Sequence, residues 1–109
     1  MDEGVEKILQ LEQRLQHAVL SDHSAIFNTA RIEALELENL MDVSIATIVS
    51  ASQRTESRGA HSRLDYPDRD DEHWLKHTLF FKEDRHLEYK PVRMKPLTVD
   101  SFPPKERVY

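Results

Sequence analysis

Residues 54–71 read RTESRGAHSRLDYPDRDD and place four arginines, five acidic residues, one histidine, one glycine and one proline in one non-repetitive stretch. Ionised side chains are almost never fully buried unless they are paired, so this stretch cannot form a core by itself. Its composition is nevertheless too specific for a flexible linker. We therefore expect it to lie against other groups that supply partner charges and backbone hydrogen bonds.

The residues before this charged stretch predict two helices. Apolar residues recur at helical spacing from about Asp2 to Val19, with polar residues on the opposite face. Turn-forming residues at 21–24 make a short connection. A second helix begins at Asn28 or Thr29, either of which is a good N-cap, and runs to about Ser52 without glycine or proline.

The apolar residues of the second helix do not stay on one stripe. Ile32, Leu35, Leu40 and Val43 lie on one side, and Ala34, Leu37, Met41, Ile45 and Ile48 lie toward another. A helix that is apolar over so wide an arc expects neighbours on more than one side. The pattern indicates that the chain is a piece of something larger.

The residues after the charged stretch predict a short helical turn, a hairpin and a tail. Asp70 or Asp71 can cap a turn that leads into Trp74. Residues 76–82 and 86–94 are rich in β-branched and aromatic residues and are separated by a plausible turn at 83–85. The four prolines from position 91 onward favour an extended tail.

These elements predict a mainly α fold in a single domain over residues 1–109. It consists of an antiparallel helical hairpin, part of a helical bundle, over 1–53, then a charged loop and short helix over 54–73. A short β-hairpin over 74–95 and an extended C-terminal tail over 96–109 complete it.

The composition excludes several classes of function. The net charge of −5 argues against a general nucleic-acid binder, and the absence of cysteine excludes disulfides and thiolate metal sites. No apolar stretch approaches the roughly 20 residues that span a bilayer, so we expect no direct membrane insertion. Gly4 and Gly59 are the only glycines, which leaves no glycine-rich turn for a nucleotide cofactor.

Metal sites are the weaker interpretation of the remaining motifs. His73 and His77 have an i, i+4 spacing that could chelate zinc, with His61 or an aspartate as a third ligand, but the HExxH pattern is missing. The aspartates at 65, 68, 70 and 71 do not follow the alternate spacing of an EF-hand loop. An ion-pair network with helix capping explains these residues better.

The arginines of the stretch allow two interpretations. Arg54, Arg58 and Arg63 could grip a carboxylate or phosphate ligand, or they could pair with Glu56, Asp65 and nearby backbone carbonyls. We favour the second. Gly59 is expected to adopt a positive φ or to allow a close backbone contact.

A resemblance to a known family gives this stretch a context. TESRGAHSRLDYPDRDDEHWLKHTL closely resembles the C-terminal region of the flavoprotein subunit of succinate dehydrogenase and fumarate reductase. FNTARIEALELENLMDVSIATIVSASQR looks like the long helix before that motif, and FPPKERVY looks like the end of the subunit. The resemblance covers essentially the whole chain. The ending favours succinate dehydrogenase over fumarate reductase.

The resemblance implies a full-length enzyme that oxidises succinate to fumarate, or runs the reverse reaction. It implies a covalently attached FAD and electron transfer through an iron–sulfur subunit to quinone. It further implies a cytoplasmic location, peripheral on the inner face of the cytoplasmic membrane through the complex, or the matrix side if mitochondrial. The family's catalytic and flavin-binding residues lie upstream, so we expect none in this chain, no bound cofactor and no activity in isolation.

We expect the charged stretch to contact the remainder of the flavoprotein subunit and to help position it. The candidate contact residues are Arg54, Glu56, Arg58, His61, Arg63, Asp68 and Arg69. With its apolar helix face exposed, the isolated chain is expected to self-associate. The alternative from a different class is a free-standing, non-enzymatic helical interaction module.

Overall fold

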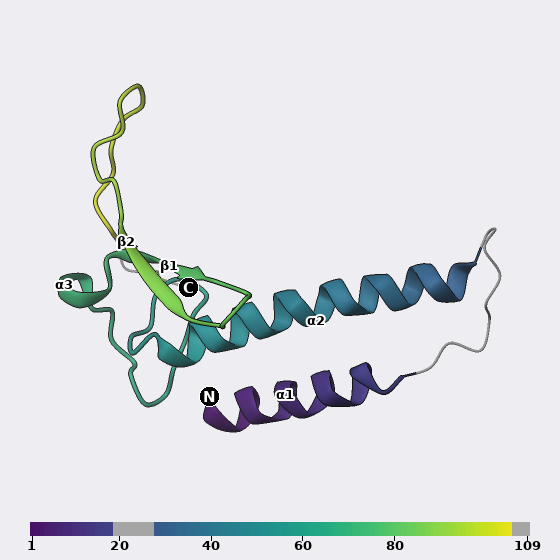
Figure 1. Cartoon of the computed structure of the whole chain (residues 1–109). Coiled ribbons are helices and arrows are strands. Elements are labelled where there is room, and N and C mark those ends of the chain that lie inside the picture. The colour runs from purple at the N-terminus through teal and green to yellow at the C-terminus, as the bar shows by residue number, and fades with distance from the viewer. Residues whose placement is uncertain (19–27, 106–109) are drawn as a thin grey trace.

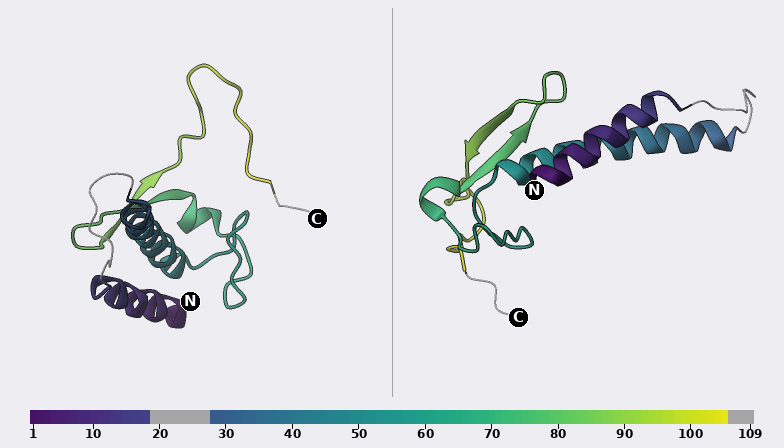
Figure 2. Two further views of the ribbon diagram at one scale, coloured as in Figure 1. Left: turned by 90° about the vertical axis from the view of Figure 1, so that its right-hand side faces the viewer. Right: turned by 90° about the horizontal axis from the view of Figure 1, so that it is seen from below.

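The computed structural model describes residues 1–18 and 28–105 and confirms the mainly α fold (Figure 1). Its elements, in chain order, are α1 (Asp2–Gln16), α2 (Thr29–Gln53), α3 (Asp71–Trp74), β1 (Lys76–Phe80) and β2 (Leu87–Pro91). Helices α1 and α2 lie side by side as an antiparallel pair, and the β1–β2 hairpin lies beside the C-terminal half of α2 (Figures 1 and 2).

Helix α1 packs its start closely against the end of α2. A Cβ atom added at Gly4 would lie 3.3 Å from Cδ1 of Ile48, so a residue without a side chain lets the two helices approach. The helix ends at Gln16, three residues before the predicted end, and Val19 lies outside the described residues. The last amides bond three residues back, which tightens the final turn and terminates the helix. The predicted connection at 21–24 also lies outside the described residues.

Helix α2 begins and ends close to the predicted positions. The side chain of Asn28 accepts a hydrogen bond from the backbone N–H of Arg31 at 2.9 Å, as expected of an N-cap. The helix continues to Gln53, one residue beyond the prediction, and Arg54 turns the backbone into an extended conformation.

The two apolar stripes of α2 have different surroundings. Helix α1 and the hairpin contact the stripe that contains Ile45, which is only 3% exposed. The four large side chains of the other stripe are 51% to 63% exposed, although Leu37 of the first stripe is also 45% exposed. These four side chains are Ile32, Leu35, Leu40 and Val43. That α2 has further neighbours on this side stays a prediction.

The hairpin pairs Lys76 with Pro91 and Phe80 with Leu87 in antiparallel register. Both strands are shorter than predicted: β1 ends at Phe80, where the chain enters the turn, and β2 ends at Pro91. The turn closes through a hydrogen bond from the N–H of Phe81 to the carbonyl of His86, and Arg85 takes a φ of 58° within it. After Pro91 the N–H of Val92 still donates to the carbonyl of Leu75 at 3.4 Å, and the chain continues without regular secondary structure as a tail that rises from the hairpin and then turns back (Figures 1 and 2).

The core of the described chain is very small. Among residues 1–18 and 28–105, Ile45 is the one apolar residue that is almost completely buried. The other two buried residues there are polar, namely Asn28 and Glu56. Apolar burial alone therefore contributes little to joining the helices to the hairpin, and polar contacts take a larger share of that role.

The N-cap of α2 gives a first prediction. Replacing Asn28 with alanine removes the acceptor for the Arg31 amide and should lower the free energy of unfolding by about 1 kcal/mol. The matched control is Asn39→Ala at an exposed position inside the same helix, where alanine should be neutral or slightly stabilising. Urea denaturation followed by circular dichroism measures both. Equal effects of the two substitutions would contradict the capping role.

Candidate functional site

The charged stretch folds into a compact loop at the C-terminal end of α2, with Glu56 at its centre. The side chain of Glu56 is fully buried. It accepts hydrogen bonds from Arg54 Nη1, from Nε and Nη2 of Arg58 at 2.8 and 3.0 Å, and from the backbone N–H of Asp70 at 2.9 Å. A buried carboxylate is tolerated only when its oxygens are satisfied in this way. We call Glu56 and these donors the Glu56 cluster.

The environment of Glu56 sets its charge. Burial by itself raises the pKa of the Glu56 carboxyl, but the hydrogen bonds from Arg58, Asp70 and Arg54 outweigh it and hold the pKa below its ordinary value. In return, the hydrogen bond that Arg58 donates to Glu56 raises the pKa of Arg58. Glu56 is therefore a carboxylate, and the Glu56 cluster is a network of hydrogen bonds between charged groups.

Arg54 connects the end of α2 to the hairpin. Its guanidinium donates to the carbonyl oxygens of Trp74 at 3.0 Å and Lys76 at 2.6 Å, and it lies 5.0 Å from the ring centre of Trp74. The indole N–H of Trp74 in turn donates to Oγ1 of Thr55 at 3.0 Å. Arg54 therefore bonds the outer edge of β1, and its guanidinium lies over the ring of Trp74, which precedes that strand.

Arg58 connects the loop to α3. Beyond Glu56 it donates to Oδ1 of Asp71 at 2.6 Å, and this hydrogen bond lowers the pKa of Asp71. Asp70 is the N-cap of α3, since its side chain accepts from the N–H groups of Glu72 and His73. The prediction that an aspartate caps this turn is confirmed.

Arg63 closes the end of α2. It forms a two-point ion pair with Asp65, at 2.9 and 2.6 Å, and donates to the carbonyl oxygens of Ser52 at 2.7 Å and Arg54 at 3.1 Å. Carbonyls at a helix C-terminus lack intrahelical partners, so a cation there stabilises them. Arg63 thus behaves as the favoured interpretation predicts, pairing with a carboxylate and backbone carbonyls.

The tip of the loop is a tight two-residue turn. Arg58 and His61 exchange backbone hydrogen bonds at 2.8 and 3.0 Å, and Gly59 between them has a φ of 58°. The positive φ expected for this glycine is confirmed. Gly59 and Ala60 are exposed, so the turn presents backbone to its surroundings.

The seven candidate contact residues divide into two groups. Arg54, Glu56, Arg58, His61 and Arg63 are bonded inside the loop, where Nε2 of His61 lies 3.3 Å from the carbonyl oxygen of Arg54, while Asp68 and Arg69 are exposed. Arg69 pairs with Asp71 at 3.0 Å, and the carbonyl of Asp68 accepts from the N–H of Ser57 at 3.0 Å. The structure therefore brings the predicted residues into one loop but gives them different surroundings.

Sequence reasoning missed the roles of three organising residues. The Ser57 hydroxyl donates to the carbonyl of Tyr66 at 2.7 Å and accepts from the N–H of Arg63 at 2.9 Å, which fixes the course of the loop. Trp74 contacts Arg54 through its ring and its carbonyl oxygen, and Asp71 accepts a hydrogen bond from Arg58. A lone serine and a tryptophan carry no spacing signal, so only the folded loop reveals these contacts.

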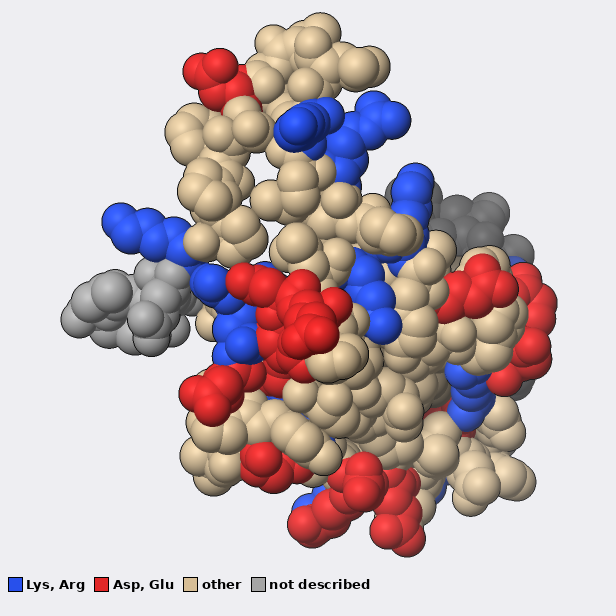
Figure 3. All heavy atoms as spheres, turned by 90° about the vertical axis from the view of Figure 1, so that its left-hand side faces the viewer, with Lys and Arg blue, Asp and Glu red and all other residues tan. Residues whose placement is uncertain are grey.

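The surface around this loop is mixed in charge. Acidic and basic side chains alternate over this end of the molecule instead of separating into a patch of one sign (Figure 3). In the described residues, no three histidine, aspartate or glutamate side chains gather as a metal site, and His73 bonds Asp70 through Nδ1 at 2.9 Å. No helix in the same residues is long and apolar enough to cross a membrane.

Comparisons with known proteins cover the whole chain. A family model described as the fumarate reductase flavoprotein C-terminal region matches residues 1–109. The chain is 63% identical over 98% of its length to the succinate dehydrogenase flavoprotein subunit of Coxiella burnetii. It is 46% identical over its full length to the fumarate reductase flavoprotein subunit of Mycobacterium tuberculosis. It spans 18% of the length of each of these two relatives.

A solved structure shares the fold. A mutant FrdA chain of Escherichia coli quinol fumarate reductase superposes with a TM-score of 0.78 at 38% sequence identity. The match covers 91% of this chain and 17% of that one. The helical pair, charged loop and hairpin therefore correspond to one part of a much longer protein.

The Glu56 cluster generates a stability prediction. Replacing Glu56 with glutamine keeps the shape but leaves Arg54 and Arg58 without their carboxylate, which should lower the free energy of unfolding by about 3 kcal/mol. The matched control Glu33→Gln changes an exposed glutamate of α2 and should cost less than about 0.5 kcal/mol. Chemical denaturation compares them. A loss below about 1 kcal/mol for Glu56→Gln would show that the network is not stabilising.

The same carboxylate predicts a pH dependence. Because the pKa of Glu56 is lowered on folding from its ordinary value of 4.5, its stabilisation is complete above that pH. It is lost as the pH falls through the folded value. The stability difference between the original chain and Glu56→Gln should therefore shrink when denaturation is repeated from about pH 6 down to about pH 3. A difference that stays constant over this range would contradict an ionised Glu56.

Proposed function

The chain belongs to the family of succinate dehydrogenase and fumarate reductase flavoprotein subunits, and we propose that it serves as the C-terminal structural domain of a succinate dehydrogenase. The match of the family model to all 109 residues carries this proposal. The higher identity to a succinate dehydrogenase subunit, 63% against 46%, supports the choice between the two enzymes. The full-length subunit would then oxidise succinate to fumarate.

The chemistry of that reaction would reside outside this chain. We assign FAD, covalently attached, to the remaining part of the subunit, and electron transfer to an iron–sulfur subunit and then to quinone. The complex would sit at the inner face of the cytoplasmic membrane, or on the matrix side in a mitochondrion. In the described residues, every buried polar side-chain atom has a hydrogen-bond partner within the chain, which supports a structural rather than a catalytic role for the charged loop.

The role we propose for the loop is to hold this domain in a fixed position against the rest of the subunit. The Glu56 cluster makes the loop rigid, because it joins α2, α3 and β1 through charged hydrogen bonds. The exposed residues Asp68 and Arg69 would then make the direct contacts. The other five candidate residues would support them by fixing the shape of the loop, namely Arg54, Glu56, Arg58, His61 and Arg63.

Fumarate reductase is the second candidate activity. The identity to the Mycobacterium tuberculosis subunit and the structural match to the Escherichia coli chain both favour it as the alternative. The ratio of succinate oxidation to fumarate reduction by the purified complex separates the two enzymes. A faster oxidation supports succinate dehydrogenase, and a faster reduction supports the alternative.

The positioning role is tested in the full-length subunit with two double variants. Asp68→Asn and Arg69→Gln together remove the charges of the two exposed candidate positions. Asp100→Asn and Arg93→Gln make the same chemical changes at exposed positions of the tail. We expect the loop variant to lower retained flavin and succinate turnover about tenfold, in line with the cost of slight misplacement at a reacting centre, and the control to change neither. Equal behaviour of the two would refute the positioning role.

A further inference from the structure

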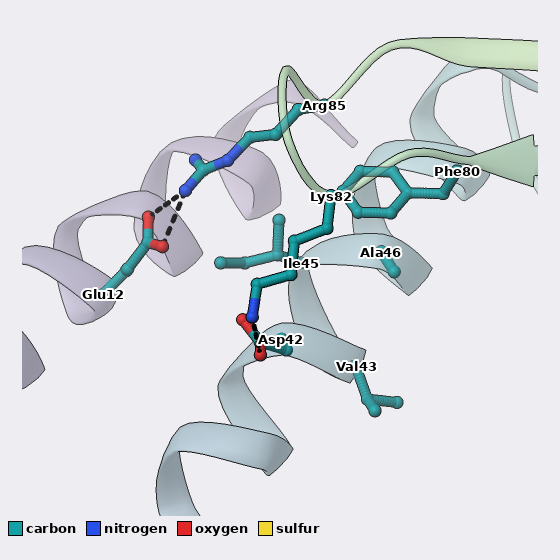
Figure 4. A pocket seen from close by; sticks show the side chains of 8 residues that line it. All are labelled: Glu12, Asp42, Val43, Ile45, Ala46, Phe80, Lys82 and Arg85. Carbon is teal, nitrogen blue, oxygen red and sulfur yellow. Dashed lines mark hydrogen bonds and ion pairs between the residues drawn. The ribbon is translucent and has the colours of Figure 1, made fainter.

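The turn between β1 and β2 carries a set of charged groups that shares no residue with the Glu56 cluster. Figure 4 shows Arg85 and Lys82 reaching toward the two helices, at the edge of a pocket of about 260 Å³. Nη2 of Arg85 donates to both oxygens of Glu12 on α1, at 2.6 and 2.7 Å. Nζ of Lys82 lies 2.5 Å from Oδ2 of Asp42 on α2. Two ion pairs therefore attach the turn to both helices.

Arg85 makes its ion pair from an unfavourable backbone conformation. Its φ of 58° lies in the left-handed region, which costs free energy for a residue with a Cβ atom. Such a conformation persists only where the surroundings enforce it. The side chain of Asp84 accepts a hydrogen bond from the N–H of His86 at 3.2 Å, and the N–H of Phe81 donates to the carbonyl of His86 at 3.1 Å. The bonds that enforce the conformation of Arg85 thus converge on His86.

The imidazole of His86 is held by three neighbours. Nδ1 is hydrogen-bonded to Oδ1 of Asp84, and Nε2 lies 3.3 Å from Oε1 of Glu88. The ring stacks on Phe81, with the ring centres 4.4 Å apart and the planes 5° from parallel. A carboxylate only accepts hydrogen bonds, and a neutral imidazole has a single N–H. Only the protonated imidazolium can therefore donate to both carboxylates at once.

We propose that His86 is a pH-sensitive clamp of this turn: its imidazolium holds the turn closed and keeps Arg85 on Glu12, and loss of the proton loosens both contacts. The clamp acts through the backbone, because Asp84 and His86 lie on either side of Arg85. The hairpin would then be attached to α1 more firmly at low pH than at high pH. This inference goes beyond the positioning role proposed above and does not depend on it.

His86 is the residue of the turn whose charge can change near neutral pH. The charged groups around it on the hairpin are Lys82, Glu83, Asp84, Arg85 and Glu88, and the helices add Glu12 of α1 and Glu38 and Asp42 of α2. Among these residue types and histidine, only histidine ordinarily changes charge near pH 7. The hydrogen bond to Asp84 raises the pKa of His86 above its ordinary value of 6.5. The stabilisation is therefore complete below that pH and is lost as the pH rises through the folded value.

Hydrogen exchange in the full-length subunit tests the clamp, with the turn and α1 followed in separate peptides by mass spectrometry. Dividing each rate by the intrinsic rate at the same pH gives a protection factor from about pH 6 to about pH 8.5. Protection of the peptide with the Phe81 and His86 amides should fall about threefold over this range, in line with an exposed ion pair. The α1 peptide around Glu12 should lose protection over the same range. Constant protection of either peptide would overturn the proposal.

Two histidine variants assign the pH dependence. His86→Gln keeps a polar side chain but cannot gain a charge, so the turn should be weakly protected at every pH in the range. The matched control is His77→Gln, at an exposed position of β1 in the same hairpin, which should behave like the original subunit. A pH dependence that survives in His86→Gln, or that disappears in His77→Gln, would assign the effect to another group and overturn the proposal.

A third variant moves the clamp instead of removing it. Asp84→Asn keeps an acceptor for the N–H of His86 but removes the carboxylate that favours the imidazolium. The loss of protection should therefore begin at a lower pH than in the original subunit. An unchanged pH dependence in Asp84→Asn would show that this carboxylate does not control the proton of His86, and it would overturn the proposal.

Discussion

The structure depends on one buried carboxylate and on the positive charges that offset the free-energy cost of removing it from water. Glu56 is fully buried, and two arginines and a backbone amide satisfy it. A chain that buries so little apolar surface cannot rely on the hydrophobic effect to join its parts. The ionised network supplies directional contacts instead, and Arg54 extends it to the hairpin. The orientation of the hairpin relative to α2 follows from these bonds.

This arrangement explains why buried polar groups are satisfied at one end of the domain while large apolar side chains stay exposed elsewhere. The charged loop satisfies its own buried groups, whereas α2 leaves a whole apolar stripe to its surroundings. The internal bonds favour a preformed loop that needs no partner to take its shape. The apolar side chains of the stripe, in contrast, stay more than half exposed. The charged loop therefore satisfies its own groups, while α2 leaves apolar surface open.

Much of the fold could be predicted from the sequence because local signals specify it. Asn28 as an N-cap, Asp70 as the cap of the short helix and the positive φ of Gly59 are each decided by neighbouring residues. The strands were predicted too long because β-branched and aromatic residues continue past Phe80 into the turn, where Arg85 takes a positive φ that the sequence pattern does not reveal. The contacts of Trp74 with Arg54 depend on residues 20 positions apart, which no local pattern reveals.

The most direct test of the account is the hydrogen exchange rate of the Asp70 amide. This N–H lies in a loop, yet it donates to the buried Glu56 carboxylate at 2.9 Å. If the network holds the structure together, the amide should be as protected as the central amides of α2, because both open only when the domain unfolds. An exchange rate typical of an unstructured loop would show that the cluster opens freely and would contradict the central role of Glu56.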